Sequence, residues 1–367
     1  MAARERVPRI PAVSAFAPGR VELLGNHTDY QEGLVLGAAI DRGLTIRGTS
    51  REDGVASMRS SLMGEFAVSL AGVQPQTANR WSNYVLGVVA ELISAGISIR
   101  GFSAEISGNL PARSGLSSSA ALEVATALFL LKLYHRELPP MELAKLCQRA
   151  EHRFAGVKSG LLDPVMSVFG RSGHAIFFDT RTEEVRIVPF PNDLSLIIAE
   201  SGIERELSDG KYNARREETF AAARALGVNA LRDVSFADLE RRNDIEPILR
   251  RRALHIVGEN ERVRRAVVLL EQGKAAEFGE LMNASHESSR KLFENSTTAL
   301  DLLVDIAREI PGVLGTRLTG AGFGGATISL CQRSRTDAAV QQLRSGYEKQ
   351  TGIAPSVFVC EIADGAA

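Results

Sequence analysis

The order in which strands and helices are predicted along this chain constrains its fold more than any other feature. Between residues 13 and 60 apolar residues alternate with polar ones, and Gly, Asp and Asn interrupt the alternation, so short strands with turns are expected. From Tyr212 to about Ile310 the pattern predicts helix almost throughout, and strands return at Ala326–Cys331 and Val357–Ile362. Strands and helices in separate blocks are typical of an α+β protein rather than of a doubly wound parallel sheet.

The remaining segments supply further elements of both kinds. Strands are expected at residues 102–106, His174–Asp179 and Leu194–Glu200, and helices at residues 83–96, at Ser118–Tyr134, after Pro139-Pro140 and at Asp337–Gln350. A chain of 367 residues has room for two domains or for one large one. We predict two domains, residues 1–185 and residues 186–367.

The charge balance and the apolar content exclude several classes of function. The formal net charge is −1, so we expect neither a nucleic-acid-binding nor a membrane-binding surface. The run Arg250–Arg252 is interpreted as a solvated helix face, with a functional basic patch as the alternative. The N-terminal residues lack the apolar segment of a signal peptide, and no apolar run reaches the length of a membrane span. A cytoplasmic enzyme is therefore expected.

The three cysteines do not suggest a metal or disulfide framework. Cys147, Cys331 and Cys360 show no CxxC spacing, and each lies in a segment with an apolar pattern. We expect all three to be buried and to behave as small hydrophobic residues.

The segment Ala17–Tyr30 places several directional polar groups close together. Arg20, His27 and Asp29 lie within ten positions of one another and form a cluster suited to binding a polyhydroxyl ligand. The alternative is a solvated loop, because the Pro-Gly and Gly-Asn pairs of this segment are turn formers.

A turn rich in Gly and Ser, residues 108–122, follows a predicted strand and opens a predicted helix. Small residues let the backbone approach a polyphosphate, and the free N–H groups of a first helical turn form an anion site with the helix dipole. Three serine hydroxyls add donors, and one can bind Mg²⁺. The turn is neither a Walker A loop, because the lysine is missing, nor a GxGxxG loop. An N-cap cluster without any ligand is the alternative.

Two carboxylates, Glu151 and Asp163, lie twelve positions apart after this helix. Asp163 has apolar neighbours, and a carboxylate in such surroundings is costly unless it is paired, so we expect Arg20 as its partner. From the pattern alone Glu151 is interpreted as a solvated residue near the end of an amphipathic helix.

The segment Leu318–Ala326 contains four glycines within six residues. Such a run costs backbone entropy, which a tight loop beside a ligand explains. A sterically forced loop between two domains is the alternative.

These motifs together resemble those of galactokinases, in the GHMP superfamily of small-molecule kinases. The segment Ala17–Tyr30 resembles the galactokinase signature, the serine-rich turn resembles the family's Pro-x-x-x-Gly-Leu-Ser-Ser-Ser-Ala phosphate motif, and Leu318–Ala326 resembles the third motif. Further similar segments are residues 80–84, 207–216, 252–259 and 281–286, so that the resemblance covers nearly the whole chain. It is more specific to galactokinases than to mevalonate or homoserine kinases, which lack the His-Thr-Asp-Tyr loop.

The resemblance implies an α+β fold of two domains. The N-terminal domain would be like ribosomal protein S5 and the C-terminal one a ferredoxin-like α/β plait, with the active site in the cleft between them. The implied activity is transfer of the ATP γ-phosphate to the anomeric hydroxyl of galactose, with Mg²⁺ as cofactor. The expected partners are galactose or a related sugar and ATP, and the expected state is a monomer or weak homodimer.

The resemblance also implies roles for individual residues. Asp163 would be the catalytic base and Arg20 would stabilise the alkoxide, while Ser119 and Glu151 would bind Mg²⁺. Sugar contacts are expected from Asn26, His27, Asp29, Gly160 and Tyr212, and nucleotide contacts from Trp81, Gly115, Ser117, Ser118 and Ser119.

Asn26 departs from the family pattern, which usually has Glu at this position. That side chain reaches the hydroxymethyl end of the sugar, and an amide cannot form the charge-assisted bond of a carboxylate. A GHMP kinase for N-acetylgalactosamine, galacturonate or arabinose is therefore an alternative. A non-catalytic galactose and ATP sensor is the alternative from another class, although the Gly-Leu-Ser-Ser-Ser-Ala region, in which such relatives differ, is intact here. Gly37, Pro164 and Leu254 also depart from the pattern and are interpreted as scaffold variation.

Overall fold

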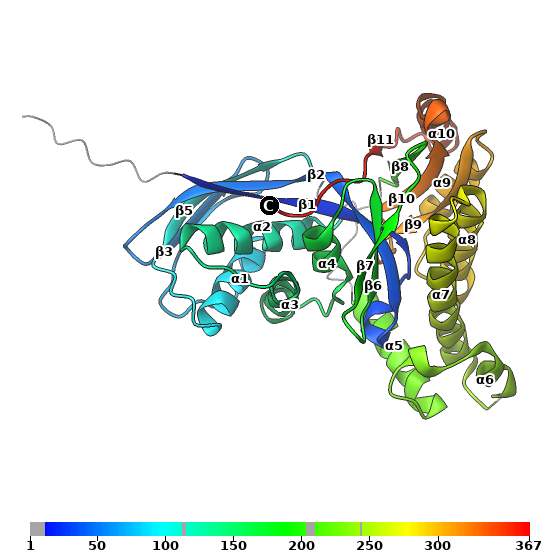
Figure 1. The fold of residues 1–367 in the computed structure, drawn as a ribbon, viewed down its shortest axis with the longest axis horizontal. Coiled ribbons are helices and arrows are strands. Elements are labelled where there is room, and N and C mark those ends of the chain that lie inside the picture. The colour runs from blue at the N-terminus through cyan, green and yellow to red at the C-terminus, as the bar shows by residue number, and fades with distance from the viewer. Residues whose placement is uncertain (1–11, 112–114, 203–209, 243) are drawn as a thin grey trace, which may run out of the picture.

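Two β-sheets with helices packed on them make up the molecule (Figure 1). The computed structural model describes residues 12–111, 115–202, 210–242 and 244–367. Parts of two segments named above, residues 112–114 and 207–209, lie outside the described residues. The predicted α+β class is confirmed by this arrangement.

The first sheet holds seven of the described strands, in the order β4-β3-β5-β2-β6-β7 with β1 paired to β2. These strands are β1 (Val13–Leu24), β2 (Leu34–Ser50), β3 (Val55–Ser60), β4 (Gly64–Ser69), β5 (Phe102–Gly108), β6 (His174–Asp179) and β7 (Val185–Pro189). All neighbouring pairs are antiparallel except β3 and β5. In β5 the predicted alternation is confirmed, because Phe102, Ala104 and Ile106 point into the core.

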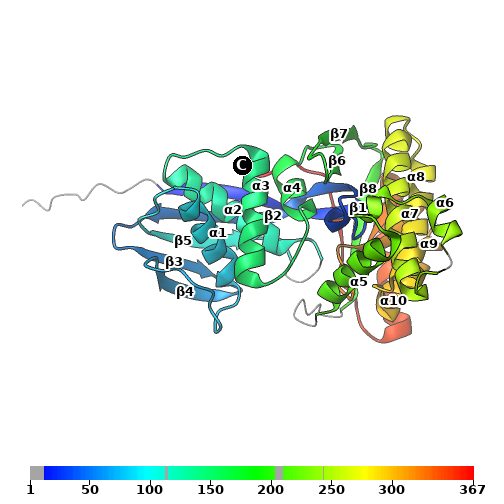
Figure 2. The ribbon, with the colours of Figure 1, turned by 90° about the horizontal axis from the view of Figure 1, so that it is seen from below.

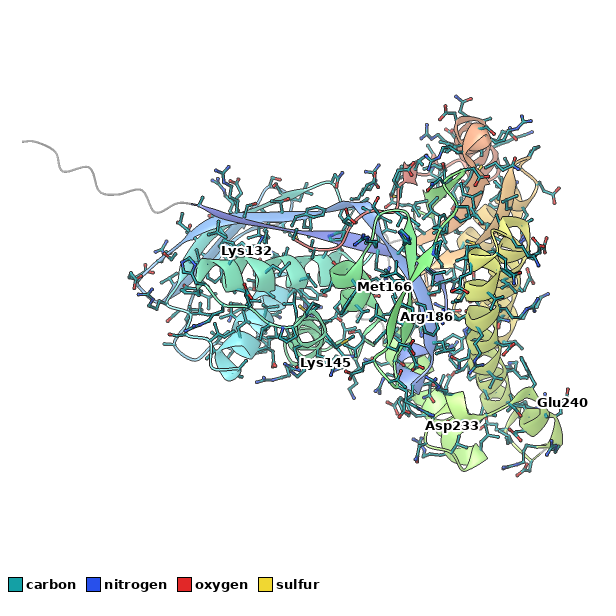
Figure 3. All side chains as sticks on the ribbon, viewed as in Figure 1. Lys132, Lys145, Met166, Arg186, Asp233 and Glu240 are labelled. Carbon is teal, nitrogen blue, oxygen red and sulfur yellow. The ribbon has the colours of Figure 1, made fainter. Side chains whose placement is uncertain are left out.

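Four helices cover one face of this sheet (Figures 1 and 2). They are α1 (Ser82–Ser94), α2 (Ser118–Leu133), α3 (Pro140–Ala150) and α4 (Leu162–Phe169). Helix α2 is buried on nearly all sides, which explains why its sequence is apolar all round. Met166 of α4, labelled in Figure 3, packs on β2 at Gly37, where a Cβ atom would lie 3.0 Å from the Met166 sulfur.

The second sheet is antiparallel, with the strand order β11-β8-β10-β9. Its strands are β8 (Leu194–Glu200), β9 (Val313–Thr319), β10 (Ala326–Gln332) and β11 (Val357–Cys360). The helices of this part are α5 (Lys211–Leu226), α6 (Phe236–Arg241), α7 (Pro247–Glu271), α8 (Ala275–Ser288), α9 (Thr298–Arg308) and α10 (Thr336–Thr351). Glu240 on α6 and Lys132 on α2 lie in opposite halves of the molecule (Figure 3). Within the described ranges, no helix has both the length and the apolar content that a membrane crossing needs.

The prediction of short strands at residues 13–60 is wrong in one respect. Strands β1 and β2 are long, with 12 and 17 residues. Three glycines of this segment, Gly37, Gly43 and Gly48, lie inside β2, where they allow backbones to approach closely. A Cβ atom on Gly43 would lie 2.4 Å from the Ala17 carbonyl oxygen, and one on Gly48 would lie 2.3 Å from that of Ser103.

The interpretation of Arg250–Arg252 as a solvated helix face is wrong for Arg252. This side chain is fully buried and pairs with Glu218 and Glu294 at 2.5 and 2.7 Å. A helix as long as α7 packs against several elements, so one charged residue of a run can face inward when carboxylates meet it. The three cysteines are free and buried, as predicted.

The chain passes from the first sheet to the second between β7 and β8. The end of the chain returns to the first sheet, where the Phe16 N–H donates to the Ala367 carbonyl at 2.8 Å. The domain division at residue 185 stays a prediction.

Candidate active site

One cavity of about 1320 Å³ gathers every residue for which the sequence predicted a site role. Its walls come from both parts of the chain, since most lining residues precede β6 and others follow β8. The predicted residues that line it are Arg20, Asn26, His27, Asp29, Trp81, Gly115, Ser117, Ser118, Ser119, Glu151, Gly160, Asp163 and Tyr212.

Arg20 and Asp163 form an ion pair in this cavity, as expected. The Arg20 Nε donates to Asp163 Oδ1 at 2.7 Å, and Nη2 lies 2.6 Å from the same oxygen. A third nitrogen, Nη1, donates to the Gly115 carbonyl at 2.6 Å. The second carboxylate oxygen of Asp163 accepts a hydrogen bond from the Ser117 hydroxyl. Asp163 is thereby fixed in orientation by two side chains from two different elements.

The local path of β1 explains how Arg20 reaches this position. The pairing with β2 shifts in register at this point, because Pro18 pairs with Gly43 and Arg20 with Ala39. The Arg20 N–H donates to the Leu116 carbonyl at 3.1 Å. A Cβ atom on Gly19 would lie 2.7 Å from that same oxygen, so only glycine lets strand and loop approach so closely.

The serine-rich turn leads directly into α2. Ser117 has the left-handed conformation, with φ 56° and ψ 50°, and its side chain makes no capping hydrogen bond to the helix. The interpretation as a simple N-cap cluster is therefore not supported. Ser118 and Ser119 open the helix and line the cavity, and their first-turn N–H groups lie where an anion would be stabilised.

Two glutamates lie near this helix end, and only one was identified from the sequence. Glu151 is buried, and the Ser159 hydroxyl donates to its carboxylate, so the interpretation as a solvated residue is wrong. Glu123, one turn after Ser119, is 1% exposed, and its Oε1 has no hydrogen-bond partner among the described residues. Burial, with Glu151 and Asp163 nearby, raises the pKa of Glu123 well above its usual value. Glu123 lies inside an apolar helical pattern, and this pattern did not indicate that the residue belongs to the site.

The loop after β1 is held in an unusual backbone conformation. Gly25 and His27 both have positive φ, at 96° and 62°. The His27 Nδ1 lies 2.7 Å from the Tyr30 hydroxyl, and Nε2 lies 3.0 Å from the Ala321 carbonyl. The His27 ring also packs on Tyr212, with 5.3 Å between centroids. The histidine thus connects this loop to the glycine-rich motif and to α5.

Asp29 depends on a glycine opposite it. A Cβ atom on Gly160 would lie 1.7 Å from the Asp29 Oδ2, so no other residue fits at position 160 without moving the carboxylate. Burial, together with the nearby carboxylates of Asp163 and Glu22, raises the pKa of Asp29 to about 7.

Helix α7 fixes the loop from behind, through residues that the sequence analysis did not assign to the site. Glu259 accepts hydrogen bonds from the Gly25 and Asn26 N–H groups at 2.9 and 3.1 Å. Although burial acts to raise the pKa of Glu259, Arg262 and His255 bring it well below the usual value. The sequence did indicate that this part of α7 is important, because the segment 252–259 resembles galactokinases.

The glycine-rich motif packs against the serine-rich turn. Gly320, Gly322, Gly324 and Gly325 all have positive φ, which explains the run of glycines. A Cβ atom on Gly320 would lie 2.9 Å from the Gly115 carbonyl oxygen. This contact supports a tight loop beside the site.

The fold is that of the GHMP kinases, and the chain belongs to this family. The chain matches the family model of the GHMP kinases N-terminal domain at residues 83–171 and that of the GHMP kinases C-terminal domain at residues 266–349. The model of the galactokinase galactose-binding signature matches residues 5–49. A mevalonate kinase of Methanococcus jannaschii has a TM-score of 0.70 at 20% identity, which shows the shared fold.

Within this class, the chain belongs to the galactokinase family. It is 41% identical to a galactokinase of Roseiflexus, over 97% of this chain and 92% of that protein. It is 38% identical to the human galactokinase, over 99% of this chain and 94% of that protein. The crystal structure of Lactococcus lactis galactokinase complexed with galactose has a TM-score of 0.93 and 35% identity, covering 97% of this chain and 95% of that one.

Proposed function

We propose that this chain transfers the γ-phosphate of ATP to the C1 hydroxyl of galactose. The observation that carries the proposal is the Arg20–Asp163 pair, which lies where β1, the serine-rich turn and α4 meet. In the reaction, the C1 oxygen forms a bond to the γ-phosphorus, the bond from that phosphorus to the bridging β–γ oxygen breaks, and ADP leaves. The proton of the C1 hydroxyl is released at Asp163.

Asp163 and Arg20 would have different catalytic roles at the sugar oxygen. Asp163 accepts or orients the hydroxyl proton, and Arg20 stabilises the negative charge that develops on the oxygen. Since phosphoryl transfer depends mainly on positioning and electrostatics, a fixed pair of this kind is the chemistry required.

The residues at the start of α2 fit a nucleotide phosphate with Mg²⁺. Ser119 and Glu151 supply the oxygen ligands that Mg²⁺ prefers, and the helix terminus suits the phosphates. The bound cation would neutralise charge on the β- and γ-phosphates. Gly115, Ser117 and Ser118 would contact the phosphates by their backbone and hydroxyl groups.

Trp81 would contact the base of the nucleotide. It lines the same cavity, and its buried Nε1 has no hydrogen-bond partner among the described residues. A buried indole N–H without a partner is costly, so a bound ligand that accepts this hydrogen bond would be favoured.

The sugar would occupy the space between the Arg20–Asp163 pair and the loop after β1. This space is surrounded by His27, Asp29, Gly160 and Tyr212. By the family pattern, the hydroxymethyl group of the sugar would lie in the part of the cavity near Asn26. We further propose that the protein is a cytoplasmic monomer or weak homodimer, without nucleic-acid or membrane partners.

ATP-dependent turnover over a sugar panel tests the proposal. The panel contains galactose, glucose, 2-deoxygalactose, N-acetylgalactosamine, arabinose and galacturonate. We expect a clear preference for galactose. Preference for a sugar changed at C2 or C6 would establish the alternative kinase, and galactose binding without turnover of any sugar would establish the sensor.

A further inference from the structure

Glu22, a residue without an assigned role, forms part of the cavity wall. It lies two positions after Arg20 on β1 and is 4% exposed. Its Oε1 accepts hydrogen bonds from Arg317 Nη1 and from Asn26 Nδ2, each at 2.9 Å. Neither bond uses Oε2, which has no hydrogen-bond partner among the residues that the structure describes.

Asn26, by contrast, has no hydrogen-bonding capacity left for a ligand. An amide side chain has two N–H donors and an oxygen with two lone pairs. The Asn26 Nδ2 donates to Glu22 Oε1 and to the Gly320 carbonyl, at 2.9 and 2.8 Å. The Asn26 Oδ1 accepts from Asn295 Nδ2 at 2.8 Å and from Ser289 Oγ at 3.4 Å. The residue is fully buried, and its amide is satisfied by protein groups.

The position of Glu22 suits the end of the sugar remote from C1. Between Arg20 and Glu22 the strand pairs regularly with β2, so both side chains point the same way, roughly 7 Å apart. A pyranose ring with its substituents spans this separation. When the C1 hydroxyl lies at Arg20, the Glu22 carboxylate faces a hydroxyl on the far side of the ring.

We propose that Glu22, not Asn26, is the residue that binds the hydroxymethyl hydroxyl of the sugar, and that its free carboxylate oxygen accepts that hydrogen bond. Asn26 and Arg317 act on the sugar only by holding the Glu22 side chain in place. The position of the hydroxymethyl group rests on the proposed function. A carboxyl acceptor at this corner explains how a chain with Asn26 can still select a sugar with a free C6 hydroxyl.

The test compares galactose with 6-deoxygalactose in the wild-type protein and in Glu22→Gln. Glutamine keeps an oxygen that can accept from Arg317 and Asn26. In the wild type, we expect kcat/KM to fall roughly 10- to 100-fold for 6-deoxygalactose, because the buried carboxyl acceptor loses its partner. In Glu22→Gln, kcat/KM for galactose should fall by a similar factor, mainly through KM, while that for 6-deoxygalactose should change less than about threefold.

Glu91→Gln is the matched control. Glu91 is 5% exposed and paired with Arg149 and Arg153, but it is absent from the cavity wall. This variant should keep both wild-type values.

Three results would overturn the assignment. One is a wild type that treats the two sugars alike, a measurement that does not depend on any variant folding. Another is a Glu22→Gln protein with wild-type melting and unchanged discrimination. The third is an equal loss for both sugars, since that pattern would show that Glu22 acts only through its neighbours. If galactose is not phosphorylated at all, the proposed function fails instead, and calorimetric titration with the two sugars still tests Glu22.

Discussion

At the residue scale, Asp163 carries the sharpest prediction. Its carboxylate is held on one oxygen by Arg20 and on the other by Ser117. Asp163→Asn keeps the shape but removes the proton acceptor, so we expect kcat to fall about 10²–10⁴-fold. Galactose binding, measured by calorimetry, should survive.

Asp179→Asn is the control for that experiment. Asp179 is another buried carboxylate paired with an arginine, Arg232, and it lies outside the cavity wall. Near-wild-type turnover of Asp163→Asn, with the control equally unaffected, would remove Asp163 from the catalytic role.

Asp29 leads to a pH-dependent prediction. Burial and two nearby carboxylates raise its pKa in the folded state to about 7, above the ordinary value of 3.8. A group with a raised folded-state pKa contributes stability that is fully present below the unfolded pKa and is lost as pH rises through the folded one. As the pH rises from 4 to 7, the unfolding free energy of the wild type should therefore fall relative to that of Asp29→Asn. Denaturant unfolding across pH 4–8 measures it, and a constant difference would contradict the raised pKa.

At the element scale, α7 is predicted to hold the loop after β1 in place. Glu259→Ala leaves the N–H groups of Gly25 and Asn26 and the buried side of Arg262 without their acceptor. Breaking a buried charged pair costs about 3–5 kcal/mol, and the loosened loop should also raise KM for the sugar. Denaturant unfolding measures the loss of stability. The rate of phosphorylation at increasing sugar concentrations measures KM.

Glu261→Ala is the control on the same helix. Glu261 is half exposed and pairs with Arg264 at 3.3 Å, so its loss should change stability by less than about 0.5 kcal/mol. If Glu259→Ala behaves like this control, α7 does not support the loop.

The elements also show which parts of the structure could be predicted from the sequence. Strands β6 and β8 and the helices around the serine-rich turn followed from local apolar patterns, which act over a few residues. Strand β9, which contains Gly315, was not among the predicted strands. In the structure this glycine lets β9 approach α8, since a Cβ atom there would lie 2.2 Å from the Gly279 carbonyl oxygen. A close approach between distant segments leaves no local signal.

The residues of the candidate site also fall into those that could be predicted from the sequence and those that could not. Arg20 and Asp163 were predicted as a pair because a carboxylate among apolar residues needs a partner. Glu22 and Glu259 were not assigned to the site, because their importance depends on which backbone and side-chain groups fold against them. The sequence of a strand or helix shows that a polar residue is present but not whether it faces a cavity.

At the scale of the whole molecule, the two sheets share one core. A single cluster of buried apolar side chains includes Val21 and Leu23 of β1, Leu196 of β8 and Ile328 of β10. Strand β1 also bonds to β9, where the Glu22 N–H donates to Thr319 Oγ1 at 3.0 Å. A core that crosses the predicted domain boundary couples the stability of the two parts.

This coupling predicts one cooperative unfolding transition that galactose shifts as a whole. A ligand at 100 times its Kd that binds only the folded state adds about 2.7 kcal/mol to the free energy of unfolding. Because the proposed sugar site contains Arg20 from the first sheet and Tyr212 from α5, both parts must be folded for binding. Calorimetric melting with and without galactose measures the shift, with a sugar inert in the turnover panel as control. Two separate transitions, of which galactose moves only one, would mean that the shared core does not couple the two parts.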